Sequence, residues 1–508
     1  MEALLRVETL RCFSLVFLSL LLLPVSIVTI WINRFLYEIQ SISRPAFERK
    51  TILVTGVGMA KGLTLARVFH RCGHRAIGAD FESRWIPCSG RYSKSLSRFY
   101  RLPKPNSESG AQVYIERLLE IIDAHKVDLW VSCSGVASAF EDAQAKEAIE
   151  KGSPCKCIQF DVSTTSALHE KDAFMRACTD RDLPVPETYD IKYRDEVFGI
   201  LAEVVARHPD RRFILKPVGM DDLHRANMTL LPLSSERKTN EHVCRLPISP
   251  ANPWILQQFI SGGEEYCTHA LVVRGVVHCF VACPSAELLM HYEALPRTSA
   301  LWQAMLEFTV QFIDRSPDPE AMTGHLSFDF MVENGAVRAD GFERKIYAIE
   351  CNPRAHTAVV LFAQAGPEER DMVRAYLSAT DPVTAVLSDD VTYSMAVSGE
   401  KPRVSPHLVM PPQDTQARYW VAHDLISLLN LPLVQMDRRR MDLRMMAEAC
   451  FAFLIRLLTW KDGTFEAWDP WPALVLYHVY WPLTILDACW HGRGWSRVNV
   501  STTKMFAC

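Results

Sequence analysis

The first feature in the pattern of hydrophobic and polar positions is an apolar run near the N-terminus. From Phe13 to Ile32 the chain has twenty residues without a charged side chain. As a helix this run would be about 30 Å long, which matches the hydrocarbon thickness of a bilayer. The bulky Trp31, Phe35 and Tyr37 stand where a signal peptidase needs small residues. The run therefore predicts a membrane anchor, with a cleaved signal peptide and a buried helix as alternatives.

Charges beside this run predict its orientation. Two arginines precede it, whereas more cations follow it, namely Arg34, Arg44, Arg49 and Lys50. Because cytosolic flanks carry the positive excess, the rest of the chain is expected in the cytosol. We therefore expect a single-pass membrane protein in which residues 1–48 are the anchor and linker.

Strand-like and helix-like patterns then alternate. Apolar runs at Ile52–Thr55 and Arg75–Asp80, separated by a glycine turn and an amphipathic helix, predict a β-α-β unit. A buried strand is expected at Val127–Ser134 and a helix at Glu141–Lys151. Residues 49–162 are thus expected to form an α/β domain with a parallel sheet.

The glycines after the first strand resemble part of a dinucleotide-binding motif. Gly56, Gly58 and Gly62 follow the spacing GxGxxxG, and Asp80 lies at a distance suited to a ribose contact. The motif itself requires GxGxxG. We therefore interpret these glycines as turn and packing residues.

A helical run from Thr164 leads into further strands. Phe213–Pro217 is a strand-like segment that contains Lys216, and Trp254–Ile260 is a second one. Met322–Phe362 then reads as a hairpin whose two strands carry acidic residues. The pattern beyond residue 400 predicts mainly helices.

Helical spacing of apolar residues follows Arg438–Arg440, and Trp468–Trp490 is apolar, aromatic and interrupted by prolines. Residues 363–400 should complete the domain that contains the hairpin, and residues 406–412 should be a linker. The helices of 401–508 are expected to pack on the body or to lie on a bilayer surface.

Composition narrows the class of protein. The chain has 508 residues, of which 49% are hydrophobic and 22% charged, which suits two or three globular domains. A net charge of −4 gives no basic stripe, so nucleic acid is not expected as a partner. The 15 cysteines are scattered and lack CxxC pairs, which favours buried thiols in a reduced compartment.

The hairpin carries the candidate chemistry. Asp329 lies on its first strand, and Glu350 and Asn352 lie two residues apart on its second strand. Side chains two residues apart on a strand share a face, so carboxylate and amide oxygens converge there. Such oxygens suit Mg²⁺, which takes its remaining ligands from water and phosphate. Arg354, again two residues on, can hold a phosphate in fork geometry.

The segment Glu350-Cys-Asn-Pro-Arg resembles the metal-binding signature of the ATP-grasp superfamily, whose members use ATP to activate an oxygen for attack by nitrogen. The resemblance implies a Rossmann-like domain at 49–162, a two-lobed ATP-grasp domain at 163–400, and a mostly helical region at 401–508. ATP and Mg²⁺, or Mn²⁺, are the implied cofactors. Asp329, Glu350 and Asn352 would be the metal ligands.

The same resemblance implies a nucleotide site. Lys171 and Lys216 match the two lysines that contact the nucleotide. Four residues match the hinge that lines adenine, namely Gln257, Gln258, Phe259 and Ile260. Glu265 matches the acid on the ribose hydroxyls, with Glu264 as its alternative.

Arg354 and Arg225 are the catalytic candidates. The loop after Lys216 contains only Gly219, where most ATP-grasp proteins have a glycine-rich loop, so Arg225 is the expected phosphate clamp. His269, His325 and His356 are candidates for assisting the nucleophile.

Longer strings, including LPISPANPWILQQFISGGEEYCTH and YAIECNPRAHTAVVLF, resemble mycosporine-glycine synthases, which attach glycine to 4-deoxygadusol. The expected substrates are therefore a small-molecule acceptor and an amino acid. Two alternatives stay open: another carboxylate–amine ligase of specialised metabolism, and a membrane-tethered nucleotide-binding protein without turnover.

Overall fold

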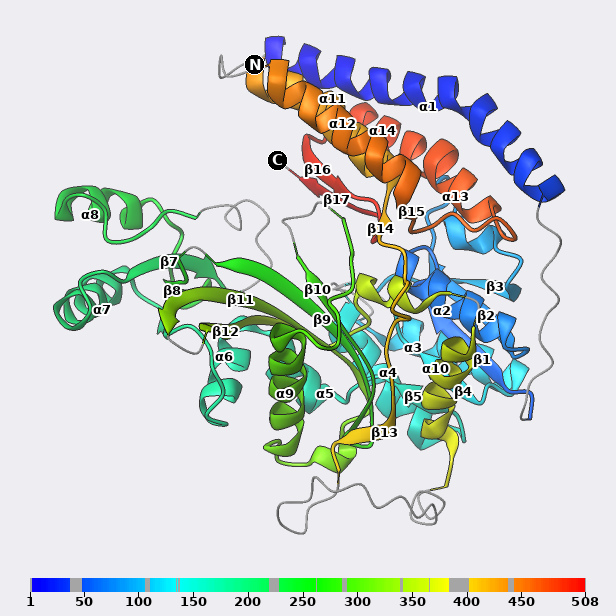
Figure 1. Ribbon diagram of the computed structural model, residues 1–508, viewed down its shortest axis with the longest axis horizontal. Helices are drawn as coiled ribbons and strands as arrows, with labels where there is room; N and C mark the ends of the chain where they lie inside the picture. The colour runs from blue at the N-terminus through cyan, green and yellow to red at the C-terminus, as the bar shows by residue number, and fades with distance from the viewer. Residues whose placement is uncertain are drawn as a thin grey trace.

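Two five-stranded sheets and one three-stranded sheet organise the protein, and a layer of helices covers one side (Figure 1). The mixed α/β class and the parallel sheet expected from the sequence are confirmed. The computed structural model describes residues 2–36, 48–105, 110–133, 135, 138–218, 228–261, 263–285, 290–338, 341–364, 366–382, 402–436 and 443–507.

The first sheet is parallel and has the strand order β3-β2-β1-β4-β5. Its strands are β1 (Thr51–Thr55), β2 (Arg75–Phe81), β3 (Leu96–Leu102), β4 (Leu129–Val131) and β5 (Lys156–Ile158). One face packs on the helices α3 (Gln112–His125) and α4 (Ala139–Gly152), and the other packs on α2 (Ala60–Arg71). The two edge strands, β3 and β5, are the ones that the sequence pattern does not predict, because β3 is polar and β5 is short.

The turn between β1 and α2 is tightly packed against β2 and the end of β4. Gly56 has a φ of +72°, and a Cβ atom on it would lie 2.5 Å from the Cys133 carbonyl oxygen. A Cβ atom on Gly62 would lie 2.4 Å from the Gly56 carbonyl oxygen. Asp80 accepts a hydrogen bond of 2.6 Å from the Gly58 N–H, and burial raises the pKa of this carboxyl group to about 6. These contacts agree with turn and packing roles for the glycines.

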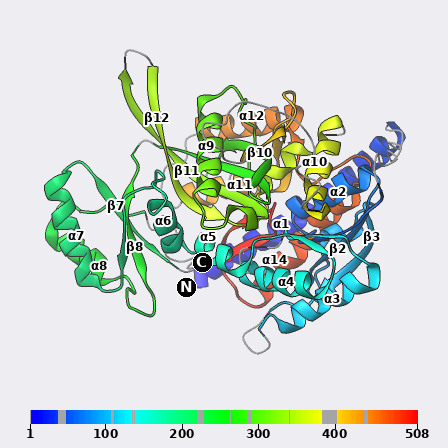
Figure 2. The ribbon, with the colours of Figure 1, turned by 90° about the horizontal axis from the view of Figure 1, so that it is seen from below.

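The three-stranded sheet is antiparallel, has the order β6-β8-β7 and projects from one side of the molecule (Figure 2). It contains β6 (Thr188–Ile191), β7 (Arg212–Pro217) and β8 (Trp254–Phe259), and it packs on α7 (Arg194–Arg207) and α8 (Glu236–Cys244). The helical run expected from Thr164 is two helices, α5 (Val162–His169) and α6 (Lys171–Thr179), which separate at Glu170.

The second five-stranded sheet has the order β12-β11-β9-β10-β13. Its strands are β9 (Glu264–Val273), β10 (Val276–Pro284), β11 (Gly324–Arg338), β12 (Gly341–Asn352) and β13 (Val404–Val409). Strand β13 pairs in parallel with β10, so the prediction of a linker from residue 406 is wrong for residues 406–409. The interruption by Pro406 hides this edge strand from a search for apolar alternation.

The second sheet lies between two layers of helices. One face packs on α9 (Ala300–Asp314) and α6. The other face packs toward the first sheet, with α2, the 3-10 helix η4 (Thr357–Phe362) and α10 (Pro367–Leu377) in between. Other 3-10 helices in the described part of the chain are short, namely η1 (Ser89–Tyr92), η3 (Pro319–Ala321) and η5 (Ser378–Thr380).

A helical layer joins the two ends of the chain. The N-terminal helix α1 (Glu2–Leu36) lies along the C-terminal π-helical turn η7 (Leu476–Tyr480) and the helix α14 (Trp481–Trp490) (Figure 1). Among the described residues, α1 is the only helix long and apolar enough to cross a membrane. The layer also contains α11 (Val421–Met436), α12 (Leu443–Thr459), α13 (Trp471–Val475) and two small sheets, formed by β14 (Arg418–Tyr419) with β15 (Lys461–Asp462) and by β16 (Trp495–Asn499) with β17 (Lys504–Ala507).

Helix α2 connects these parts through buried cations. Arg67 is 2% exposed and donates from Nε to the Asp469 carboxylate over 2.9 Å. Its other nitrogens donate to the Thr464 and Asp469 carbonyl oxygens, both over 2.8 Å. Ser93 Oγ and the Lys94 N–H also donate to Asp469. The ion pair is therefore fully hydrogen-bonded, which is what makes a buried charge tolerable.

We predict that Arg67→Ala lowers the free energy of unfolding by about 3–5 kcal/mol, because it leaves the Asp469 carboxylate buried without its cation. Chemical denaturation in mild detergent measures this change. The matched control is Arg117→Ala, whose partner Glu120 is 64% exposed and whose pair contributes about 0–1 kcal/mol. Equal small losses in both variants would contradict the assignment of Arg67 as a structural cation.

Candidate functional site

The acidic residues of the hairpin meet at one end of the second sheet. Asp329 on β11 lies directly opposite Glu350 on β12, and Ser327 lies opposite Asn352. Asn352 donates from Nδ2 to the Asp329 carboxylate over 3.1 Å. The structure therefore brings together the three residues that the sequence predicts as metal ligands.

Alternation along the strands explains this placement. Phe328 and Phe330 pack into the core on the α9 face of the sheet, as does Cys351. Asp329 and Glu350 stay half-buried on the opposite face, which is the face toward α2 and η4. A register shift follows Asp329, so the strand is irregular where the acids meet.

Cations border the acids. Arg354 donates from Nη2 to the Asn352 side-chain oxygen over 2.7 Å. The next residue, Ala355, accepts a hydrogen bond of 2.9 Å from Lys61 Nζ. Lys61 comes from α2 and is fully buried, and burial, followed by the nearby Arg354, lowers its pKa to about 7.

Lys61 is a site residue that the sequence analysis missed. It stands between Gly58 and Gly62 in the segment interpreted as a turn with packing glycines. Its position among buried residues of an amphipathic helix was the available signal, since a lysine is seldom fully buried without a partner. The partner lies 294 residues away, beyond the reach of any local pattern.

Two of the residues expected to bind the nucleotide contact each other on the three-stranded sheet. Lys216 Nζ donates to the Gln257 side-chain oxygen over 2.9 Å. Gln257 is 2% exposed, and its Nε2 donates to Thr188 Oγ1 over 3.2 Å. Gln258 is half-buried, and its side-chain oxygen accepts from the Glu187 N–H over 3.3 Å. Lys216 is thus held at the end of its strand by a buried amide.

The remaining residues expected to line adenine or to bind the ribose lie between the end of β8 and the start of β9. Phe259 is half-buried, and Ile260 is buried immediately after β8. Glu265 is half-buried at the start of β9 and accepts from Ser285 Oγ over 3.3 Å. Glu264 is exposed and accepts from the Tyr266 hydroxyl over 2.8 Å. Both carboxylates are thus present where the three-stranded sheet joins the second sheet.

Lys171 is half-buried in the first turn of α6. Arg225, the expected phosphate clamp, lies outside the described residues.

The three candidate histidines lie on the face of the second sheet toward α2. His269 accepts from the His356 N–H over 3.3 Å, and His325 Nε2 lies 2.8 Å from the Tyr376 hydroxyl. Burial lowers the pKa of His269 to about 3 and holds the pKa values of His325 and His356 well below their usual range. Each imidazole is therefore neutral, and these contacts favour structural roles for His269 and His325.

Of the three expected metal ligands, the two carboxylates are placed to share a hard cation and the Asn352 amide is not. Within the described ranges, no group of three or more His, Cys, Asp and Glu side chains is arranged to hold a metal ion. The carboxylates of Asp329 and Glu350 are opposed across two strands, as a shared ion requires. Asn352 presents its nitrogen to Asp329 and its oxygen to Arg354, so its amide must turn over to become a ligand.

No family model matches the chain, and no curated protein matches it. Among solved structures, it is similar to an N5-carboxyaminoimidazole synthetase from Staphylococcus aureus complexed with ADP, at 13% identity over 67% of this chain and 78% of that chain, with a TM-score of 0.46. An L-amino acid ligase from Bacillus licheniformis gives 13% identity over 61% and 68%, with a TM-score of 0.39. These values are too low to support an argument about family or activity.

We predict that Lys61 makes stability depend on pH with a defined sign. Its folded-state pKa, about 7, lies below the ordinary value of 10.5. Between these values the unfolded chain holds a proton that the folded chain lacks, so stability falls by about 1.4 kcal/mol for each unit that the pH decreases. Denaturation of wild type and Lys61→Met at several pH values measures this.

The wild type should lose stability relative to Lys61→Met as the pH falls from about 10 to about 7, with little further change below. Lys126→Met is the matched control, because that side chain is 82% exposed in the folded state. A stability difference between wild type and Lys61→Met that is constant over this range would contradict the assignment.

Proposed function

We propose that the protein is an ATP-grasp ligase that uses ATP and Mg²⁺ to form a carbon–nitrogen bond. The observation that carries the proposal is the pairing of Asp329 with Glu350 across two strands, with Asn352 and Arg354 beside them. The support from the other lobe is Lys216, which is fixed by the Gln257 amide on a separate sheet. Carboxylates on one sheet and a cation on another suit a nucleotide whose phosphates lie between them.

The chemistry would divide between activation and attack. The γ-phosphoryl group of ATP moves to a carboxylate or enol oxygen of the acceptor, its bond to the β-phosphate oxygen breaks, and ADP leaves. An amine then attacks the activated carbon and loses a proton to solvent, the carbon–oxygen bond breaks, and inorganic phosphate leaves. When bound, Mg²⁺ neutralises charge on the phosphates, and Asp329 and Glu350 would hold it.

The cations of the chain would serve the same transfer. Arg354 can hold two phosphate oxygens at once, which a lysine cannot, so we assign it to the phosphorylated acceptor. Lys171 and Lys216 would bind the nucleotide phosphates as point charges, and Arg225 would close over them. The hinge residues Gln257–Ile260 would line adenine, and Glu265 would accept the ribose hydroxyls.

For the substrates we propose 4-deoxygadusol as acceptor and glycine as amine, giving mycosporine-glycine. The support is the resemblance of the strings around Glu265 and Glu350 to mycosporine-glycine synthases. The alternative is an ATP-grasp ligase that joins a different acid and amine in specialised metabolism, with the same residues in the same roles.

We also propose that the protein is attached to a membrane through α1 and that its catalytic residues face the cytosol. The length and composition of α1 support the attachment. The cations after residue 33 support this orientation for a helix that crosses the bilayer once, which is what the sequence alone predicts for α1.

We predict that purified protein releases ADP only when ATP, Mg²⁺, acceptor and amine are all present. With 4-deoxygadusol and glycine, the product should absorb in the near ultraviolet. Turnover with an unrelated acid and amine, but none with 4-deoxygadusol, would favour the alternative ligase. Nucleotide binding without ADP release from any pair would favour a tethered nucleotide-binding protein.

Glu350→Ala should abolish Mg²⁺-dependent ADP formation, because it removes one of the two carboxylates that would hold the ion against the nucleotide phosphates. Its thermal unfolding should stay close to that of the wild type, since the Glu350 side chain is only half-buried. Glu307→Ala is the matched control, as this exposed carboxylate lies on α9 across the same sheet. Full ADP formation by Glu350→Ala would remove Glu350 from the metal site.

A further inference from the structure

Helix α1 has two faces of different character. Its outer face carries large apolar side chains at helical spacing, each between 40% and 91% exposed, namely Leu10, Phe13, Phe17, Leu20, Leu21, Val25, Ile27, Val28, Trp31, Ile32 and Phe35. Its inner face packs on the protein, where Cys12 and Leu15 are 4% and 7% exposed. Soluble monomers rarely expose so large a continuous apolar surface.

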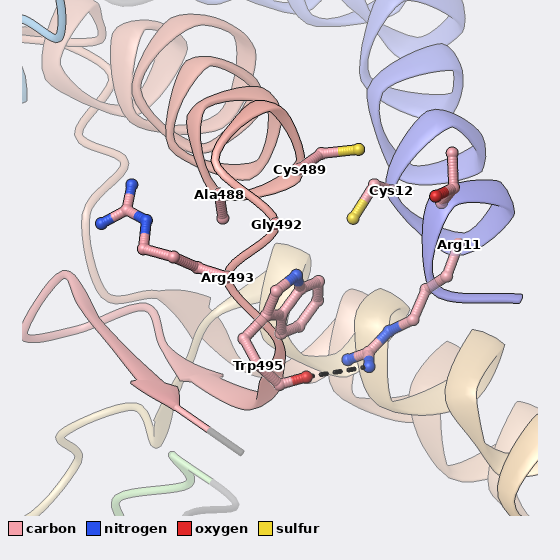
Figure 3. A pocket seen from close by; sticks show the side chains of 8 residues that line it. Arg11, Cys12, Ala488, Cys489, Gly492, Arg493 and Trp495 are labelled. Atoms are coloured by element: carbon pink, nitrogen blue, oxygen red, sulfur yellow. Dashed lines mark hydrogen bonds between the residues drawn. The ribbon is translucent and has the colours of Figure 1, made fainter. Parts of the chain in front are cut away.

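The inner face is fixed to the C-terminal part of the chain by specific contacts. Ser19 Oγ donates to the Tyr477 carbonyl oxygen over 3.0 Å, and the His478 ring nitrogens lie 3.1 Å from Ser19 Oγ and 2.8 Å from Ser26 Oγ. Arg11 lies 3.6 Å from the centre of the Trp495 ring and donates to its carbonyl oxygen (Figure 3). These contacts extend over about fifteen residues of the helix, or roughly 22 Å.

A cavity lies beside the Arg11 contact. It is lined by both chain ends, including Cys12, Cys489 and Trp495 (Figure 3). Its volume of about 40 Å³ leaves room for a water molecule and is far too small for a nucleotide. The joint between α1 and α14 is therefore packed, and it is not a second ligand site.

The polar side chains of the exposed surface of α1 bond to the helix itself. Ser14, Thr29 and Asn33 donate to carbonyl oxygens four residues earlier, over 2.8, 2.9 and 2.9 Å. The donor groups of these three side chains are thus satisfied within the helix, which suits a hydrocarbon environment.

Helix α12 adds a second apolar surface with the same character. Its exposed side chains are Phe451, Leu454, Ile455, Leu457 and Leu458, the last being 84% exposed. Arg456 faces the protein and donates to Asp424 on α11 over 2.7 Å, whereas Arg444 and Glu448 form an exposed ion pair. Thr459 donates back to the Ile455 carbonyl oxygen over 2.8 Å. Helices α1 and α12 lie on the same side of the molecule (Figure 1).

We propose that α1 and α12 together form a surface that lies on a lipid bilayer, with α1 parallel to the membrane plane. The exposed Trp490, at the end of α14, and Trp31, on α1, suit the interface between headgroups and acyl chains. Arg497 in the same layer is exposed and suits anionic headgroups, whereas Arg444 and Arg493 are paired with Glu448 and Asp487.

The contacts of the inner face disfavour a crossing helix. If α1 crossed the bilayer, His478 and α14 would have to enter the hydrocarbon with it, because they are bonded to its inner face. Helix α14 in turn packs on the body through Trp481 and Ile485, which are both 3% exposed. If α1 lies in the membrane plane, its apolar outer face contacts lipid and its inner face keeps its contacts with the protein.

Protease protection of the full chain in sealed microsomes distinguishes the two orientations. The chain carries one epitope tag at each end. A helix in the membrane plane leaves both tags outside, so protease removes both. Protection of the N-terminal tag alone would show that α1 crosses and would overturn the proposal.

Flotation with vesicles of phosphatidylcholine and phosphatidylserine tests the contribution of α12. The double variant Leu454→Glu/Leu458→Glu should lower the bound fraction at least fivefold while thermal unfolding in detergent stays unchanged. Val113→Glu is the matched control, since Val113 is 47% exposed on α3 in the first domain. Unchanged flotation of the double variant would overturn the proposal. The proposal would also be overturned if the wild type formed a dimer without detergent and the double variant lost that dimer with no change in flotation. Neither readout depends on ligase activity.

Discussion

Three basic side chains on one helix, two of them buried, hold the main parts of this protein together. From α2, Lys61 reaches the strand end that carries Arg354, Arg67 reaches Asp469 near the C-terminus, and Arg71 pairs with Glu369 on α10. Removing these polar groups from water is costly, so their positions in the fold depend on the hydrogen-bond partners that they find there. The geometry of the candidate site therefore depends on a helix that contributes none of the predicted metal or nucleotide residues.

Local periodicity was enough to predict which side chains of the β11–β12 hairpin share a face. The two-residue repeat of a strand places Glu350 and Asn352 on one face, and the antiparallel register brings Asp329 to them. The same reasoning located β1, β2, β7 and β8 to within a residue or two. In each case the interacting residues are close in sequence or share a repeating pattern.

Contacts between distant segments could not be read from the sequence. The bond from Lys61 to Ala355 joins residues 294 apart, and the Ser19–His478 contact joins residues 459 apart. Strand β13 was missed because it forms by pairing with β10, which is distant in sequence and presents a free edge only once the sheet has assembled. A single apolar run likewise predicts membrane affinity for α1 but leaves undetermined which of its faces is covered by protein.

The joint between α1 and α14 has a consequence for how the chain is made. Helix α1 is synthesised before the residues that cover its inner face, Tyr477 to Trp495. At about 5–20 residues per second, roughly half a minute to a minute and a half separates the two events. During that interval both faces of α1 are uncovered, so the nascent chain must be shielded by a chaperone or by lipid before it can finish folding.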